Sequence, residues 1–265
     1  MWSVLPIALS LLLVLPQAPK AATSHKTQPK TSKIWIGRYA EFEEFLRTAT
    51  FERFEDTDVG VTRPRHGFFA PGGLAGGATV KNLSPGRQRG FFESYRSEIA
   101  AYKLDRLLQL DMVPPTVERR VDGDLVSVQL WVDDTQTIGA VQQKKLHAPN
   151  PAAWNRDVYR QRVFDNLVSN IDVNAGNLLI DPAWHIIKVD HSRCFAEDKM
   201  PFEMTRIDRS MFERIKALDR ATLDREIGEW MESGTIDSLL ERRDRIVQKF
   251  QELIAKQGEA RVLLR

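Results

Sequence analysis

Three oxygen-bearing side chains lie close together in one stretch of the carboxy-terminal half of the chain. Asp172 comes first, Asn177 follows shortly after it, and Asp190 stands directly behind the apolar run 186–189. Phosphoryl transfer needs one carboxylate that orients and deprotonates a hydroxyl, together with oxygen ligands for Mg²⁺. The types and spacing of these residues meet that demand, so we expect phosphoryl-transfer chemistry here.

The residues around this stretch predict the elements that would hold the three side chains in place. Apolar residues recur at helical spacing and predict a helix over 154–170. The short, branched, apolar runs 178–180 and 186–189 predict a buried hairpin, with Asp181 and Pro182 in its turn. A plainer alternative is that the Asp and Asn residues only cap the helix and form turns.

The stretch 163–192 resembles the catalytic loop and metal-binding segment of protein-kinase-like folds. Asn170-Ile-Asp172, together with Asn177, is closest to the atypical branch. That branch contains the phosphatidylinositol 3- and 4-kinases, the HipA toxin kinases and the secretory-pathway casein kinases. The resemblance implies that Asp172 is the catalytic base, that Asn177 and Asp190 bind Mg²⁺, and that ATP is the phosphoryl donor.

One position departs from the pattern of these families. They usually have His, Gly or Arg-His directly after the catalytic Asp, whereas Val173 and Asn174 follow Asp172 here. The departure leaves the contact to the transferred phosphate open, and we include Asn174 with Asp172 in the catalytic group. Its side chain can donate a hydrogen bond but carries no charge.

The amino-terminal half contains a candidate phosphate-binding lysine. Lys81 lies in Ala-Thr-Val-Lys on the predicted strand 78–83, and it resembles the strand lysine that contacts the α- and β-phosphates in kinases. A long helix is predicted over 91–110, and the resemblance implies that its Glu98 pairs with Lys81. Glu93 is the alternative partner. An exposed strand lysine without a function is the alternative for Lys81 itself.

Two glycine-bearing loops compete for the role of covering the nucleotide phosphates. The glycines of 71–77 lie too near Lys81 for a strand to intervene, so we interpret them as a hairpin turn. Gly60 with Thr62 is then expected to cover the nucleotide. Neither loop contains the Gly-Lys-Ser/Thr of a Walker A motif.

A hinge between two lobes is predicted after the hairpin 116–131. Its strands flank Asp122-Gly123, a strong turn dipeptide. By the same resemblance, the backbone of Leu130, Trp131 and Val132 is expected to bind adenine, and the Trp131 ring to line the pocket. Core packing of that ring is the alternative.

Further elements complete the prediction. We expect a helix over 34–50, strands over 51–57 and 66–70, and helices over 137–146, 210–218, 222–232 and 236–256. Arg193 belongs to the short segment 192–209 that follows Asp190. We expect its guanidinium to be solvated surface charge, with contact to an acidic substrate or a phosphate as the alternative.

Composition narrows the classes of protein. The chain has 265 residues, of which 42% are hydrophobic and 28% charged, as in globular proteins large enough for two lobes. Its net charge of +2, without a dense basic stripe, gives no reason to expect nucleic acid as a partner. Cys194 is the single cysteine, which excludes an internal disulfide and zinc sites built on cysteine pairs.

The first residues have the length of a targeting segment. The apolar run 4–15 is too short to span a bilayer, and small residues follow it, so we interpret 1–22 as a signal peptide or a short hydrophobic anchor and 23–33 as a linker. The protein would then be exported or membrane-associated. Without a functional leader the protein would be cytoplasmic. The lysines after the apolar run also favour a cytoplasmic location for the rest of the chain.

Together these patterns predict an α+β, two-lobed protein-kinase-like fold. A small antiparallel β-sheet lobe with one long helix would span 34–130, and a mainly helical lobe would span 131–265. The predicted function is transfer of the γ-phosphoryl group of MgATP to a hydroxyl-bearing acceptor, which could be a protein, a lipid or a small molecule. The alternatives are a nucleotide-binding pseudokinase or scaffold, and an exported protein that binds a non-nucleotide ligand.

Overall fold

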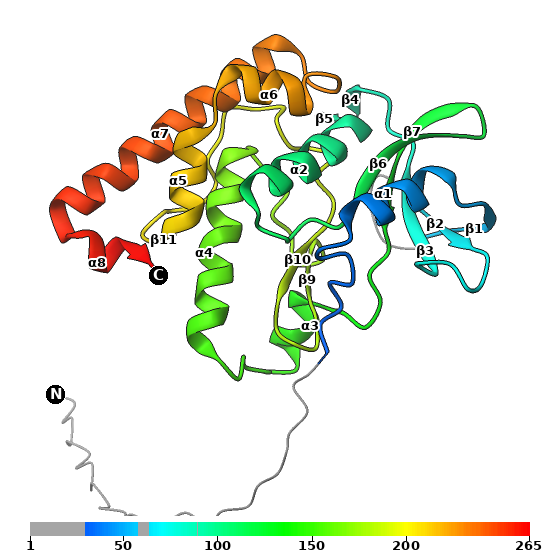
Figure 1. Ribbon diagram of the computed structural model, residues 1–265, viewed down its shortest axis with the longest axis horizontal. Coiled ribbons are helices and arrows are strands. Elements are labelled where there is room, and N and C mark those ends of the chain that lie inside the picture. Colours follow the sequence, from blue (N-terminus) through cyan, green and yellow to red (C-terminus); the bar gives the residue numbers. More distant parts are fainter. Residues whose placement is uncertain (1–29, 58–63, 89) are drawn as a thin grey trace, which may run out of the picture.

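The computed structural model describes residues 30–57, 64–88 and 90–265. They form two lobes, one built around an antiparallel sheet and the other mainly helical (Figure 1). The predicted leader, most of the predicted linker, and Gly60 with Thr62 lie outside the described residues. No described helix is long and apolar enough to cross a membrane.

The sheet of the first lobe has the strand order β1-β2-β3-β7-β6, and all neighbours are antiparallel. The strands are β1 (Phe51–Asp56), β2 (Arg65–Phe69), β3 (Gly77–Lys81), β6 (Thr116–Val121) and β7 (Asp124–Leu130). β3 and β7 lie in the middle, where Val80, Val126 and Val128 are buried. The turn between β6 and β7 has positive φ at both Asp122 and Gly123, as the Asp-Gly dipeptide predicted.

Two helices accompany this sheet. α1 (Tyr39–Thr48) buries Phe42 and Leu46 in the core of the sheet lobe. α2 (Tyr95–Leu108) lies between the sheet and the helices of the second lobe (Figure 1), and its Leu104 and Leu108 belong to the core of that second lobe. α2 therefore connects the packing of the two lobes.

Two of the helices begin clearly later in the chain than predicted. Residues 91–94 do not belong to the predicted helix 91–110, because β5 (Phe91–Glu93) pairs with β4 (Gly86–Gln88) and the Ser94 side chain caps α2. The helix predicted from residue 34 begins only at Tyr39. The residues before it form turns, with Gly37 at a φ of +77°.

The second lobe contains the remaining helices and three small groups of strands. The helices are α3 (Ile138–Gln143), α4 (Pro151–Leu167), α5 (Arg209–Ala217), α6 (Arg220–Ile227), α7 (Ser233–Gln257) and α8 (Glu259–Val262). The strands are β8 (Gln136–Thr137), β9 (Leu178–Ile180), β10 (Ile186–Lys188), β11 (Ile207–Asp208) and β12 (Leu263–Leu264). The predicted hairpin is present as β9 and β10. α4 starts at Pro151, earlier than predicted, because the Asn150 side chain caps it.

The described chain begins on the helical lobe and then crosses to the sheet lobe. Thr31 Oγ1 and Ser32 N donate to the same oxygen of Asp181, at 2.7 and 3.1 Å. Asp181 lies in the turn between β9 and β10, whereas Trp35 is buried in the core of the sheet lobe. We call residues 31–35 the amino-terminal strap. The end of the predicted linker is thus packed against the folded domain.

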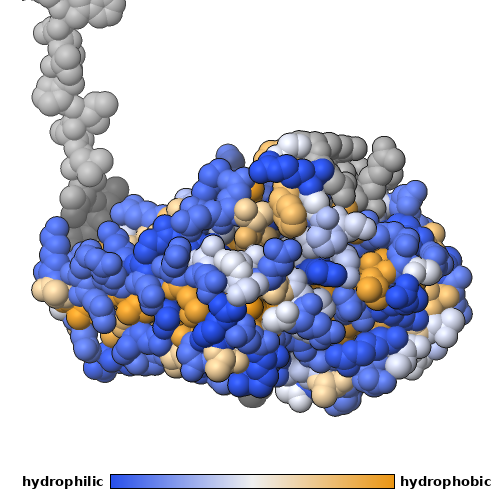
Figure 2. All heavy atoms as spheres, turned by 90° about the horizontal axis from the view of Figure 1, so that it is seen from above, coloured by the Kyte–Doolittle hydropathy of each residue, from blue (hydrophilic) through white to orange (hydrophobic). Residues whose placement is uncertain are grey.

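The surface seen from above is mainly hydrophilic. Figure 2 shows polar residues over most of this face, with apolar residues in small groups between them. This pattern is ordinary for a protein surface.

Candidate active site

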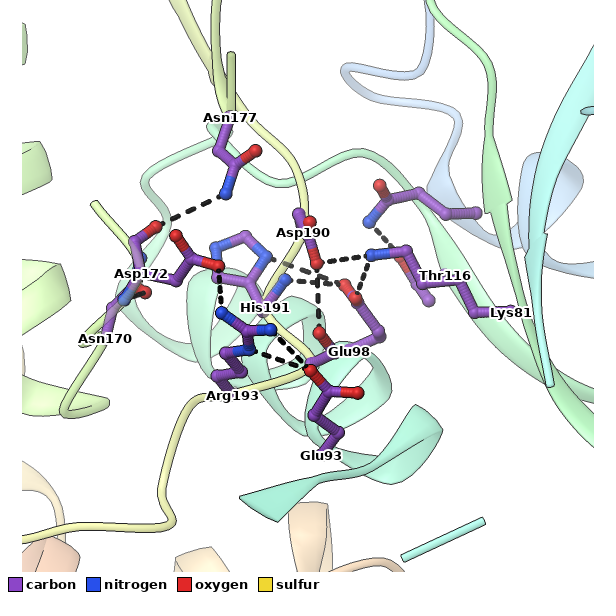
Figure 3. Close-up of polar contacts among 12 residues, drawn as sticks. Lys81, Glu93, Glu98, Thr116, Asn170, Asp172, Asn177, Asp190, His191 and Arg193 are labelled. Carbon is purple, nitrogen blue, oxygen red and sulfur yellow. Dashed lines mark hydrogen bonds and ion pairs between the residues drawn. The ribbon is translucent and has the colours of Figure 1, made fainter. Parts of the chain in front are cut away.

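Lys81, Glu98 and Asp190 meet between the two lobes (Figure 3). Lys81 is the last residue of β3, and its Nζ donates to Glu98 Oε1 at 2.5 Å and to Asp190 Oδ1 at 2.6 Å. The Lys81 and Glu98 side chains are 6% and 2% exposed, against 25% for Asp190. Glu98 is therefore the partner of Lys81, as predicted, and Glu93 is not.

Burial and charge oppose each other in this cluster. Burial alone would lower the pKa of Lys81, but the carboxylates of Asp190 and Glu98 raise it above its ordinary value. Burial would also raise the pKa of Asp190, yet Lys81 holds that pKa below its usual range. For Glu98 burial dominates, and its pKa is raised. Lys81 is thus charged, with two carboxylates sharing one ammonium.

The backbone presents Asp190 to the space between the lobes. β10 is fixed by Lys188 N, which donates to Met112 O at 2.8 Å, and Val189 N then donates to Asn177 O at 3.1 Å. Asp190 itself has a φ of +62°, in the left-handed region that few side chains other than Asn and Asp adopt. Its Oδ1 accepts from Lys81 and from Ser192 Oγ, and neither bond uses Oδ2.

The loop that carries Asp172 is held from helix α4. Asp165, fully buried on α4, accepts at Oδ1 from Asn170 Nδ2 at 2.9 Å and lies 2.7 Å from the ammonium of Lys188. Asn170 Oδ1 accepts in turn from Asp172 N at 3.1 Å, and Asn177 Nδ2 donates to Asp172 O at 3.3 Å. The amide oxygen of Asn177 points away from this contact (Figure 3). Polar groups therefore fix the loop on both sides of Asp172, with buried Asp165 and Asn170 before it and half-buried Asn177 after it.

Asn174 has a place in the turn of this loop. Its Oδ1 accepts from Gly176 N at 2.6 Å, an Asx turn of the kind that the plainer alternative predicted. Asn174 also lines the cavity described next. Donation from its amide to a phosphate stays a prediction.

A cavity of about 610 Å³ joins these groups. It lies between β3, β7, the Asp172 loop and the β9–β10 hairpin. Its lining includes Thr79, Lys81, Gln129, Leu130, Trp131, Val132, Asp172, Asn174, Asn177, Leu179, Val189, Asp190 and Arg193. The volume is in the range of small-molecule sites, and apolar residues at the hinge end face polar residues at the other.

The hinge differs from the prediction in its hydrogen bonds. Leu130 N donates to Pro115 O at 2.9 Å, and Trp131 N donates to Gly77 O at 3.1 Å. Neither N–H is thus free to bind adenine, and within the described residues Val132 is the hinge position whose N–H has no backbone partner. The Trp131 ring is 36% exposed and stacks on His66, with centroids 3.9 Å apart. The alternative of core packing for Trp131 is therefore wrong.

Gln129, directly before the hinge, has a fixed amide orientation. Thr116 Oγ1 donates to Pro114 O at 2.9 Å, so its hydroxyl hydrogen is used. The same oxygen accepts from Gln129 Nε2 at 2.9 Å. The amide oxygen of Gln129 must then face the other way, and Gln129 lines the cavity. Sequence reasoning missed this acceptor, because its orientation depends on the pairing of β6 with β7.

Arg193 is not solvated surface charge, so that expectation was wrong. Its side chain is 13% exposed and pairs with Glu93 and with Asp172 (Figure 3). Its partners are carboxylates of the chain itself, and contact with an acidic substrate or a phosphate stays a prediction. One feature of the sequence could have indicated this contact. The residues after Asp172 are uncharged, so a cation paired with Asp172 has to come from another segment.

The donor set fits Mg²⁺. Asp190 Oδ2 and the amide oxygen of Asn177 are hard oxygen donors on the cavity wall. Among the described residues there is no group of three or more His, Cys, Asp or Glu side chains that could hold a metal. Mg²⁺ commonly takes one or two protein oxygens and completes its octahedron with phosphates and water, so two protein donors suffice.

The fold is similar to solved kinase structures. A Golgi casein kinase with Mn/ADP bound has a TM-score of 0.64 at 14% identity, covering 86% of this chain and 79% of that one. A Fam20 protein of hydra with sugar has a TM-score of 0.63 at 13% identity, covering 85% and 92%. The Helicobacter pylori proinflammatory kinase CtkA has a TM-score of 0.53 at 11% identity, covering 81% and 98%.

Comparison by sequence gives no relative, since no family model and no curated protein matches the chain. The structural likeness nevertheless confirms the fold that the residues around Asp172 and Asp190 predicted. The chain has an atypical protein-kinase-like fold, with an antiparallel sheet lobe and a mainly helical lobe.

Proposed function

We propose that the protein transfers the γ-phosphoryl group of ATP, with Mg²⁺, to a hydroxyl-bearing acceptor. The observation that carries this proposal is the convergence of Lys81, Asp190 and Asp172 on one cavity between the lobes, with buried Glu98 holding Lys81 in place. The kinase-like fold supports it, and so does the Mn/ADP named for the Golgi casein kinase structure.

Each residue has a defined task in this reaction. The Lys81 ammonium, already held between two carboxylates, binds the α- and β-phosphates, and Glu98 keeps it in place. Asp190 and Asn177 hold magnesium, which neutralises phosphate charge when bound. Asp172 accepts the proton of the acceptor hydroxyl. The new O–P bond forms as the bond between the γ-phosphorus and the bridging oxygen of ADP breaks.

The experiment compares the wild type with Asp172→Asn. Each purified protein is incubated with γ-labelled ATP, Mg²⁺ and whole-cell extract, and labelled protein, lipid and small molecules are separated. We expect Asp172→Asn to reduce transfer by at least 100-fold while nucleotide affinity and thermal stability remain close to wild type. Full transfer by Asp172→Asn would refute the role of Asp172.

A nucleotide-binding pseudokinase or scaffold is the second candidate. The uncharged residues Val173 and Asn174 after Asp172 favour it. In that case the wild type would bind MgATP in calorimetry but label no acceptor in the same extract. An absence of any Mg²⁺-dependent ATP binding would favour a non-nucleotide ligand instead.

We also propose that residues 1–22 act as a signal peptide or short anchor, and that the lobes divide at about residue 130. Fractionation of cells that express the full chain, beside a chain beginning at residue 30, tests the first part. Equal distribution of both chains between soluble and membrane fractions, without export, would contradict it.

A further inference from the structure

Arg193 connects two carboxylates across the cleft (Figure 3). Its Nη1 donates to Asp172 Oδ2 at 3.0 Å. Its Nε and Nη2 donate to Glu93 Oε1 at 2.8 and 2.7 Å. The Glu93 side chain is 4% exposed and that of Asp172 25%. The guanidinium is thus anchored on its buried side and presents one nitrogen to the proposed catalytic base.

Strand β5 supplies the anchor. Phe91 and Glu93 are two residues apart on this strand, so their side chains leave it on the same side. The Arg193 Cζ atom lies 4.4 Å from the centroid of the Phe91 ring. An aromatic face and a carboxylate therefore hold the guanidinium together, which limits its rotation.

Arg193 supplies the positive charge beside Asp172 that the Asp172 loop itself lacks. Val173 and Asn174 are uncharged, and among the described residues Arg193 is the one cation paired with Asp172. A hydrogen bond to one carboxylate oxygen limits the rotation of the Asp172 carboxylate. The other oxygen, Oδ1, can then face the acceptor hydroxyl.

We propose that Arg193 is a positioning residue for phosphoryl transfer, which orients the Asp172 carboxylate and is itself held by Glu93 and Phe91. This rests on the proposed function. In the transfer step the acceptor O–H proton goes to Asp172 Oδ1, the acceptor oxygen bonds to the γ-phosphorus, and ADP leaves with its bridging oxygen. The proton then passes from Asp172 to solvent.

The test separates orientation from stability. Arg193→Met leaves the buried Glu93 carboxylate unpaired and is expected to lower the melting temperature. The double variant Glu93→Gln, Arg193→Met removes that unpaired charge, so it should regain stability. Its kcat should remain about 100-fold below wild type, the loss expected from a misplaced reacting group, with little change in KM for ATP. Arg206→Met, at an exposed position of the same segment, is the matched control.

Two further readouts distinguish the role. Added guanidinium at millimolar concentration should raise the kcat of Arg193→Ala several-fold but not that of Asp172→Asn. Arg193→Lys should fall between wild type and Arg193→Met, because its single nitrogen cannot occupy the three positions from which the planar guanidinium donates.

The following results would contradict the proposal. A double variant with wild-type kcat would show that Arg193 has only a structural role. A higher kcat in Arg193→Met would show that the contact between Arg193 and Asp172 inhibits the reaction. If the wild type transfers phosphate but Arg193 variants are unaffected, only the role of Arg193 fails. A wild type without turnover overturns both proposals, because an orienting role requires a reaction.

Discussion

At the scale of single residues, the orientation of the Gln129 amide bears on which purine would bind if the protein uses a nucleotide as proposed. One N–H of its amide donates to Thr116, and this bond orients the amide so that its oxygen lies on the opposite side. Adenine has an exocyclic amine, a donor, where guanine has a carbonyl oxygen, an acceptor. If the cavity binds a nucleotide as proposed, we expect the Gln129 acceptor to favour ATP over GTP.

We predict that Gln129→Met narrows this selectivity. Methionine has a similar volume but no strong acceptor, so ATP affinity should fall by about 1 kcal/mol, roughly fivefold, while GTP affinity stays constant. Thr116→Val is the informative partner, because it frees the amide to turn its donor to the cavity and should raise GTP affinity. Calorimetric titration with both nucleotides measures the ratio. An unchanged ratio in both variants contradicts the prediction.

The sequence was sufficient to bring together residues of one segment, although their roles stay predictions. Asp172, Asn177 and Asp190 stand at fixed intervals around a short hairpin, and that spacing carries over to the fold. Arg193 could not be placed in this way. Asp190 has a left-handed φ, and a turn of this kind redirects the residues behind it, an effect that residue types alone do not reveal.

At the scale of elements, α2 is held against the segment that follows Asp190. Ser94 N donates to Ser192 O at 2.9 Å, and Ser97 Oγ donates to Cys194 O at 3.2 Å. His191 N donates to Glu98 Oε2 at 2.9 Å. Together these bonds fix the distance between Glu98 and Asp190, and so the place of Lys81.

The other end of α2 contains a buried carboxyl. Asp105 Oδ1 accepts from Met112 N at 3.1 Å and Val113 N at 3.2 Å, while its Oδ2 has no partner within the described residues. Burial raises the pKa of Asp105 to about 7. The folded chain therefore binds more protons than the unfolded chain between pH 4 and 7, and its stability falls as pH rises through that window.

We predict that Asp105→Asn removes this pH dependence. Asparagine keeps an oxygen for the two backbone donors but carries no charge. The difference between the two pKa values of Asp105 corresponds to at most ~4 kcal/mol, so above pH 7 the variant should be as stable as wild type or more stable. Urea unfolding at pH 5 and pH 8 measures this. Parallel pH profiles for the two proteins would contradict it.

Element boundaries were predicted less well where strand pairing decides them. Phe91 and Phe92 continue the apolar pattern of α2, yet they pair with residues 86–88 as a strand. The prediction that the N–H groups of Leu130 and Trp131 are free to bind adenine was wrong for the same reason. Their use by Pro115 and Gly77 follows from how the ends of β6 and β3 meet β7, a contact between distant segments.

At the scale of the whole molecule, the two lobes are joined outside the hinge as well. The Glu93–Arg193–Asp172 contacts cross the cleft on one side. The amino-terminal strap crosses elsewhere, from Asp181 in the helical lobe to Trp35 in the sheet lobe. Relative motion of the lobes is therefore restrained at both places.

We predict that Asp181→Asn loosens the strap. Burial alone would raise the pKa of Asp181, but hydrogen bonds from His185 and Thr31 lower it to about 2. This stabilisation is present above pH 4 and is lost as pH falls towards 2. At pH 7 the variant should be destabilised by about 1–3 kcal/mol, with faster hydrogen exchange over residues 31–48.

Asp133→Asn, at an exposed hinge carboxylate, is the control. If Asp181→Asn and Asp133→Asn have equal exchange rates and equal unfolding midpoints, the strap does not hold the lobes.

The strap also determines where an amino-terminal membrane anchor would be attached to the folded domain. An anchor in residues 1–22, as proposed, would be attached through residue 30, next to the strap that contacts both lobes. A fully extended chain from 23 to 30 reaches no more than about 30 Å. An enzyme anchored to a bilayer in this way would therefore modify acceptors within a few nanometres of the lipid surface. Distance from the membrane would then restrict which molecules become its substrates.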